Sequence, residues 1–183
     1  MGLFYGVKNT ETSNTPYAST YGTPAPADAG TDILFTNEDV DTPNPNFTVD
    51  SVTGKYRTLS STEWTYLFNK RTVNGGKGIG KSYSLNVTYC GQKGVVIYPD
   101  YYSGSPLSSG TDYSELPEGS VFLPFNGFRF VGTVTMNYCV YWGSDAANAS
   151  EFHLLLCNND SVSPVTSRGR NLGFGIRLVS DVE

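Results

Sequence analysis

The chain of 183 residues contains little of the chemistry on which most enzyme sites depend. It has one histidine, His153, and three cysteines, Cys90, Cys139 and Cys157, whose spacing matches no metal-binding motif. His153 lies between two apolar residues, an alternating context that favours an outward-facing strand position over a catalytic base. One cysteine pair could bridge, but the sequence favours free, partly buried thiols. We therefore expect a protein that is not an enzyme and needs no cofactor and no metal.

Positive charge and long apolar runs are also scarce. Twelve lysines and arginines face 17 acidic residues, for a formal net charge of −5, and every lysine lies at or before Lys93. No basic cluster indicates a nucleic-acid partner, and no apolar run approaches the length of a membrane span. We expect neither nucleic-acid binding nor membrane insertion by this segment. Met1 is not followed by a signal-like apolar core, so an export signal or anchor is expected to lie outside it.

The stretch GGKGIGKS, residues 75–82, fits the phosphate-loop pattern, but its surroundings do not. A phosphate loop needs a buried strand before it and a helix that opens at its Lys-Ser. Here residues 61–70 have apolar side chains at helical spacing, after a capping box formed by Ser60 and Glu63. After the loop, residues 83–89 alternate between apolar and polar as a half-buried strand does. This order predicts an exposed turn that binds no nucleotide.

The rest of the chain indicates an α+β fold rich in loops. The 38% apolar and 14% aromatic content suits one domain, 1–183, with a core that includes Trp64 and Trp142. Residues 1–55 are rich in Thr, Pro, Asn and Asp, and we expect an irregular segment packed on that domain, with a free linker as the alternative. A tight turn is expected at residues 92–94. Short antiparallel strands follow one clear helix, about 61–70, and this loop fraction is typical of binding proteins.

Five blocks of sequence, in a fixed order, carry a resemblance to a known domain family. The blocks read YRTLSSTEWTYLFNKR, GVVIYPD, PEGSVFLPFNGFR, YWGS and RNLGFGIRLV. Over Leu59 to Val179 they resemble the Fibrobacter succinogenes major paralogous domain of Bacteroidetes surface proteins, which has a C-type lectin-like fold. The C-terminal part is similar to the variable proteins of diversity-generating retroelements. The resemblance implies a fixed scaffold that displays hypervariable residues within a variable region over 138–179.

Residue-by-residue alignment with this family separates fixed from variable positions. Trp142, Leu154 and Leu156 fall on fixed core positions. The expected variable, ligand-binding positions are Cys139, Tyr141, Gly143, Asp145, His153, Leu155, Cys157, Ser161, Ser163, Val165, Ser167, Gly169, Asn171 and Leu172. Because successive strand side chains point to opposite faces, Leu155 should lie on the face opposite its two neighbours. The expectation is an exposed apolar residue on a binding face.

The genetic code allows a check on these positions. Retroelements of this kind mutate adenines, and an asparagine codon altered in this way never encodes Lys, Glu, Gln, Met or Trp. Every expected variable position obeys this limit, whereas Glu151 does not and is expected to be fixed. Ordinary drift in a surface loop produces the same pattern and stays open as an explanation.

The resemblance implies a protein that binds a protein or glycan ligand on another cell or host surface. Its expected place is extracellular, on a cell surface or on a virion. Calcium-dependent sugar binding is not expected. Residues 157–160, CNND, lack the tryptophan of the Trp-Asn-Asp that the calcium-dependent members of the wider C-type lectins carry, and no Glu-Pro-Asn occurs. One alternative is a non-diversified surface adhesin of the same family. Another, of a different class, is a formylglycine-generating type of enzyme that uses Cys139 and Cys157.

Overall fold

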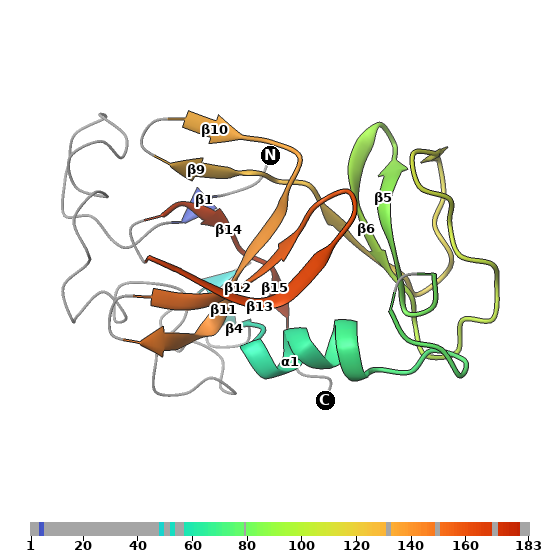
Figure 1. Ribbon diagram of the computed structural model, residues 1–183, viewed down its shortest axis with the longest axis horizontal. Helices are drawn as coiled ribbons and strands as arrows, with labels where there is room; N and C mark the ends of the chain where they lie inside the picture. Colours follow the sequence, from blue (N-terminus) through green and yellow to red (C-terminus); the bar gives the residue numbers. More distant parts are fainter. Residues whose placement is uncertain are drawn as a thin grey trace.

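The computed structural model describes residues 4–5, 48–49, 52–53, 57–78, 80–130, 133–148, 151–169 and 172–179. Within these ranges one short helical segment accompanies two larger antiparallel-rich sheets and three two-stranded ladders (Figure 1). The expected α+β class is therefore confirmed. The irregular segment expected over residues 1–55 lies outside the described residues, apart from residues 4–5, 48–49 and 52–53.

The larger sheet has five strands in the order β1-β14-β11-β12-β13. Its centre is the long hairpin of β11 and β12, and β13 forms one edge. The strands are β1 (Phe4–Tyr5), β11 (Cys139–Asn148), β12 (Glu151–Cys157), β13 (Val162–Gly169) and β14 (Phe174–Gly175). Register shifts interrupt β11 between Trp142 and Ala146, and they interrupt the β12–β13 ladder opposite Leu155. Such bulges bend a strand and redirect its side chains.

The second sheet has four strands in the order β7-β5-β6-β8. These are β5 (Tyr83–Tyr89), β6 (Gln92–Ile97), β7 (Asp112–Tyr113) and β8 (Val121–Pro124). The remaining strands form two-stranded ladders: β2 (Thr48–Val49) with β3 (Val52–Thr53), β4 (Arg57–Thr58) with β15 (Leu178–Val179), and β9 (Phe128–Phe130) with β10 (Thr133–Thr135). Figure 1 shows β5 and β6 at the right of the molecule and the β9–β10 hairpin at the upper left, above β1 and β14.

The turn between β5 and β6 differs from the sequence-based expectation. It lies at Cys90 and Gly91, two residues earlier than predicted, and both residues have positive φ, 49° and 79°. A two-residue hairpin favours such a turn because its twist matches that of the strands. A second difference lies in β5, where a bulge beside Asn86, φ 51°, moves Val87 away from the face of Tyr83 and Leu85. The predicted single apolar face is wrong for this reason.

The helical segment covers the predicted range with a change in hydrogen bonding. It begins as α1 (Ser61–Thr65) and continues as the π-helical turn η2 (Tyr66–Lys70). The predicted capping box is present: the Ser60 hydroxyl accepts from the Glu63 N–H, and the Glu63 carboxylate accepts from the Ser60 N–H at 2.7 Å. Trp64 and Phe68, four residues apart, lie on the buried side of the segment.

The glycine-rich loop follows the helix and precedes β5, so the predicted helix-loop-strand order is confirmed. Val73 and Gly76 pair across a tight turn through two backbone hydrogen bonds of 2.8 Å. Lys77 and Lys81 are exposed as predicted. Ser82 is not: it is fully buried, and its hydroxyl accepts from the Gly78 N–H at 2.9 Å. The loop is therefore a turn whose C-terminal end is held in place by the buried Ser82.

Three apolar clusters hold these elements together. The first joins the helix to both sheets and contains Trp64, Phe68, Leu85, Val95 and Leu155 among others. A second cluster, around Trp142 and Phe174, covers the opposite face of the five-stranded sheet. The third lies under the long loop that follows β6. Trp64 and Trp142 are 1% and 2% exposed, which confirms both as core residues.

Candidate functional site

The expected variable positions divide into a buried group and an exposed group. The buried group is Cys139, Tyr141, Gly143, Leu155 and Cys157. Leu155 and both cysteines are 0% exposed and Tyr141 is 4% exposed, so the expected display of these side chains is wrong. Asn171 lies outside the described residues.

The helix explains why the exposure of this group was mispredicted. Leu155 and Leu154 do lie on opposite faces of β12, because they belong to different clusters, as the alternation argument predicted. However, α1 packs across β11, β12 and β13 on the Leu155 side. The hairpin is thus packed on both faces around residues 139–142 and 154–155, and no side chain there is displayed. Nearer the hairpin turn, Asp145 and His153 are half-buried.

The exposed group gathers on the edge strand β13 and the turn before it. Ser161, Ser163 and Val165 are exposed, and Ser167 and Gly169 are half-buried. Ser163 stands opposite Leu156 and Ser167 opposite His153 in the ladder with β12. Small side chains at an exposed edge make few packing contacts, so their replacement disturbs the fold little. This edge is where the expected variable positions meet solvent.

The turn that introduces β13 is built by one asparagine. The Asn158 side-chain oxygen accepts from the backbone N–H groups of Asp160 and Ser161, at 2.9 and 2.8 Å, and from the Ser161 hydroxyl at 3.0 Å. An asparagine that bonds its own backbone two residues on forms an Asx turn. The exposed Ser161 therefore stands on a turn of defined shape.

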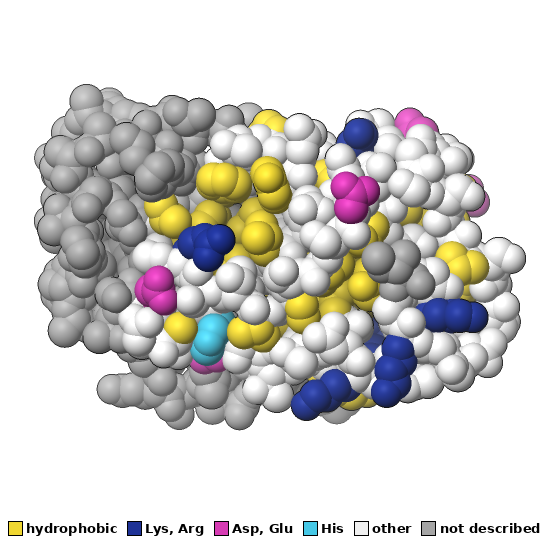
Figure 2. Space-filling view, viewed as in Figure 1, with side chains coloured by type: hydrophobic (Ala, Val, Ile, Leu, Met, Phe, Trp, Pro, Cys, Tyr) yellow, Lys and Arg dark blue, Asp and Glu magenta, His cyan; other side chains and the backbone are white. Residues whose placement is uncertain are grey.

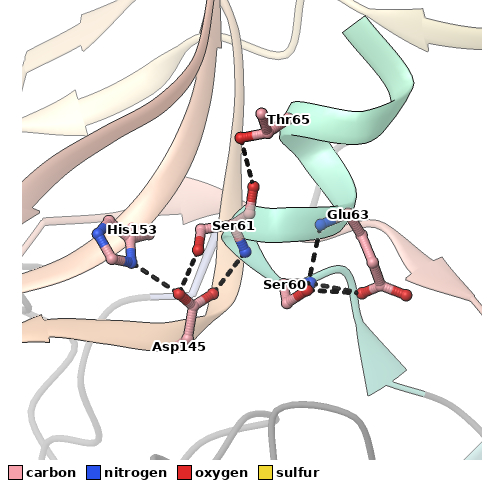
Figure 3. A network of polar contacts seen from close by, with 6 residues as sticks. All are labelled: Ser60, Ser61, Glu63, Thr65, Asp145 and His153. Carbon is pink, nitrogen blue, oxygen red and sulfur yellow. Dashed lines mark hydrogen bonds and ion pairs between the residues drawn. The ribbon is translucent and has the colours of Figure 1, made fainter. Parts of the chain in front are cut away.

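Asp145 forms a hydrogen-bonded network between the hairpin and the helix (Figure 3). Its two carboxylate oxygens accept from the Ser61 N–H at 2.6 Å and from the Ser61 hydroxyl at 2.5 Å. The second of these oxygens also lies 2.7 Å from His153 Nδ1. Three partners for one carboxylate fix the first turn of α1 against β11 and β12.

This network does not have the arrangement of a catalytic triad. In Figure 3 the Ser61 hydroxyl points to the carboxylate and not to the imidazole, so Ser61 is not placed as a nucleophile that His153 activates. The His153 side chain is 25% exposed and the Asp145 side chain is 20% exposed. Both are half-buried positions at the flank of the β13 edge, since His153 stands opposite Ser167. The interpretation of His153 as an outward-facing strand residue holds only in part.

An apolar surface adjoins the same edge. Figure 2 shows hydrophobic side chains gathered between the β9–β10 hairpin and β13. The partly buried members of the Trp142 cluster include Phe128, Tyr138, Leu156 and Leu172. Leu172, an expected variable position, is therefore half-buried against this cluster. The combination is an apolar area beside a polar edge strand.

Glu151 and Arg168 border the edge, and sequence reasoning singled out only the first of them. The Glu151 carboxylate accepts from the Ser167 hydroxyl at 2.9 Å and from the Asn148 amide at 3.0 Å, which ties the N-terminal end of β12 to both neighbouring strands, β13 and β11. Arg168 is exposed, and its guanidinium donates to the Ser167 carbonyl at 2.7 Å. Ser61 was also missed, because 84 residues separate it from Asp145 and no local pattern joins them.

Burial favours the uncharged forms of two side chains in the hairpin, Tyr141 and Cys139. Burial raises the pKa of Tyr141 well above its ordinary value, and its hydroxyl donates to the Pro124 carbonyl at 3.2 Å. Burial also raises the pKa of Cys139, followed by the effect of the hydrogen-bonded Cys157 thiol. A thiol with a raised pKa has little thiolate character and is a poor nucleophile.

Comparison of the chain with family models, with curated proteins and with solved structures found no significant match. Among the described residues, no group of three or more His, Cys, Asp or Glu side chains is placed to hold a metal ion. Within the same residues, no helix combines the length and hydrophobicity needed to cross a membrane.

Proposed function

We propose that the protein is a ligand-binding module with a C-type lectin-like fold, diversified by a retroelement. Its binding surface is the β13 edge with the turn before it, and its ligand is a protein or glycan on another cell or host surface. The protein works outside the cell, on a cell surface or on a virion. Ser161, Ser163, Val165, Ser167 and Gly169 contact the ligand, and Asp145, His153 and Leu172 flank them.

One observation carries this proposal: the exposed members of the expected variable set lie on one edge strand, β13, and on the turn before it, whereas Cys139, Tyr141, Leu155 and Cys157 on the neighbouring strands are buried. A rigid scaffold with a tolerant edge is what diversification requires, because changes there leave the core intact. The five buried positions belong to the scaffold. We propose no enzymatic activity, since a buried Cys139 with a raised pKa lacks the activation that a catalytic thiol needs.

A second candidate is a non-diversified surface adhesin in which the same edge binds one fixed partner. The burial of Cys139, Tyr141, Leu155 and Cys157 favours it, because these positions tolerate little variation. The neighbouring DNA separates the two. A near-copy of the segment that encodes Tyr138 to Val179, differing chiefly at adenines and lying beside a reverse transcriptase gene, is expected for the diversified protein. Its absence leaves the adhesin.

Two matched libraries test the binding surface. The first randomises Ser161, Ser163 and Val165, and the second randomises Tyr141, Leu155 and Cys157; both are displayed on yeast and selected against a panel of soluble proteins and glycans. We expect most members of the first library to fold and some to bind a panel member specifically. Members of the second should mostly fail to fold. If the first library unfolds as often as the second, or folds without yielding any binder, the proposal is wrong.

A further inference from the structure

Cys139 and Cys157 stand directly opposite each other in the antiparallel pair of β11 and β12. Opposite residues in such a pair have Cα atoms about 4.5 or 5.5 Å apart, depending on whether the pair is hydrogen-bonded. Both separations lie within the window of about 4.4–6.8 Å that a disulfide requires. The two side chains project from the same face of the sheet and enter the same apolar cluster. The backbone therefore already has the geometry of a bridge.

We propose that Cys139 and Cys157 are a modification site at which an oxidant forms a cross-strand disulfide that locks the β11–β12 hairpin. The thiols are free in this structure. Cys90, the remaining thiol, is exposed in the tight turn of the other sheet, where its sulfur lies 3.7 Å from the Ser114 carbonyl. The fold thus separates the solvent-facing thiol of Cys90 from the buried thiols of Cys139 and Cys157. Only the buried pair is placed to form a disulfide within the chain.

The reaction is a thiol–disulfide exchange with a small-molecule disulfide such as oxidised glutathione. One cysteine loses its proton and attacks one sulfur of the small disulfide. The S–S bond of the small disulfide breaks, one half leaves as a thiol, and the other half stays on the protein as a mixed disulfide. The second cysteine loses its proton and attacks the protein sulfur of that mixed disulfide, and the second small thiol leaves. The two cysteines are oxidised, and the small disulfide is reduced to two thiols.

Burial determines when this bond forms. Both thiols are 0% exposed, and the side chains of Trp64, Tyr141 and Leu155 belong to the cluster around them. An oxidant cannot reach them in the closed fold, and burial disfavours the thiolate of Cys139, the form that attacks a disulfide. The bridge therefore forms as the chain folds, or when the hairpin opens, and is thereafter protected from reductants. The folded, reduced protein should react slowly.

The experiment uses the full chain and the variant Cys90→Ser, each unfolded, reduced and refolded with excess oxidised glutathione or with a reductant. Samples are acid-quenched, unfolded, alkylated with N-ethylmaleimide and weighed by intact mass spectrometry. After oxidative refolding we expect one adduct on the full chain, either N-ethylmaleimide or glutathione on Cys90, none on Cys90→Ser, and a peptide pair linking Cys139 to Cys157 before reduction. Closing a loop of roughly 20 residues should raise the Tm by about 6–12 °C in both proteins.

Three results would overturn the proposal: three adducts after oxidative refolding, a bridge that includes Cys90, or glutathione retained on Cys139 or Cys157. A further variant, Cys157→Ala, should lose the redox-dependent change in Tm. The adduct count on the full chain and on Cys90→Ser decides the question even where Cys157→Ala fails to fold. None of these outcomes depends on whether β13 binds a ligand.

Discussion

Replacement of Leu155 by alanine should destabilise the protein strongly, although the sequence pattern assigned this residue to a binding face. Leu155 is 0% exposed and shares a cluster with Trp64, Tyr141 and Cys157 between the helix and the hairpin. Truncation of an enclosed leucine costs about 2–5 kcal/mol, the larger values arising where the surroundings cannot collapse into the cavity. Packing from a helix on one side and a sheet on the other restricts such collapse. We therefore expect a loss of about 3–5 kcal/mol.

Urea unfolding followed by tryptophan fluorescence measures this loss, because Trp64 and Trp142 both lie in the core. The matched control is Val165→Ala on β13, whose side chain is 39% exposed and should change the free energy of unfolding by no more than about 0.5 kcal/mol. For a chain of this size the Leu155→Ala Tm should fall by at least about 6 °C. If both variants unfold at the same urea concentration, the two-sided burial of the hairpin is refuted.

Three more predictions concern polar groups. Asp145→Asn should lower the free energy of unfolding in urea by about 1.5–3 kcal/mol, because the charged acceptor for Ser61 and His153 is lost. An equal loss in Asp160→Asn, a change in the exposed turn, would contradict this role of Asp145. Ser60→Ala should cost about 1 kcal/mol by the same assay, because the capping box is removed, and an unchanged midpoint would refute it. Burial raises the pKa of Tyr141 above its ordinary value of 10.0, so the contribution of this tyrosine to stability is complete below pH 10 and is lost as the pH rises further. When the free energy of unfolding is measured against pH, its decrease at alkaline pH should be shallower in Tyr141→Phe than in the unmodified protein. An identical decrease would disprove the raised pKa of Tyr141.

Local signals in the sequence predicted the elements well. The spacing of Trp64, Leu67 and Phe68 with the Ser60–Glu63 capping box gave the helical range, because capping and amphipathic periodicity act within a few residues. The helix-loop-strand order around residues 75–82 was also correct. These features depend only on neighbouring residues, and so a single sequence contains them.

What the sequence did not reveal was what lies above each face of a strand. Alternation separates Leu154 from Leu155, but only tertiary packing decides that α1 covers the Leu155 side. The bulge beside Asn86 similarly reverses the side-chain direction of β5 after Leu85, and no residue type at this position predicts a bulge. Ser61 and Asp145 meet across 84 residues for the same reason. Each failure concerns contacts between elements that are distant along the chain.

The edge position of β13 has a consequence for solubility. An unpaired strand edge offers backbone N–H and C=O groups to any other strand, including that of a second copy, and invites polymerisation. β13 carries Pro164, which has no N–H to donate, a bulge opposite Leu155, and the charged Arg168. These features disfavour hydrogen bonding between this edge and a strand of another molecule. Under the proposed function, variation of the other side chains of β13 is therefore tolerated only while Pro164 and Arg168 are retained, because these two residues hinder association between copies of the protein.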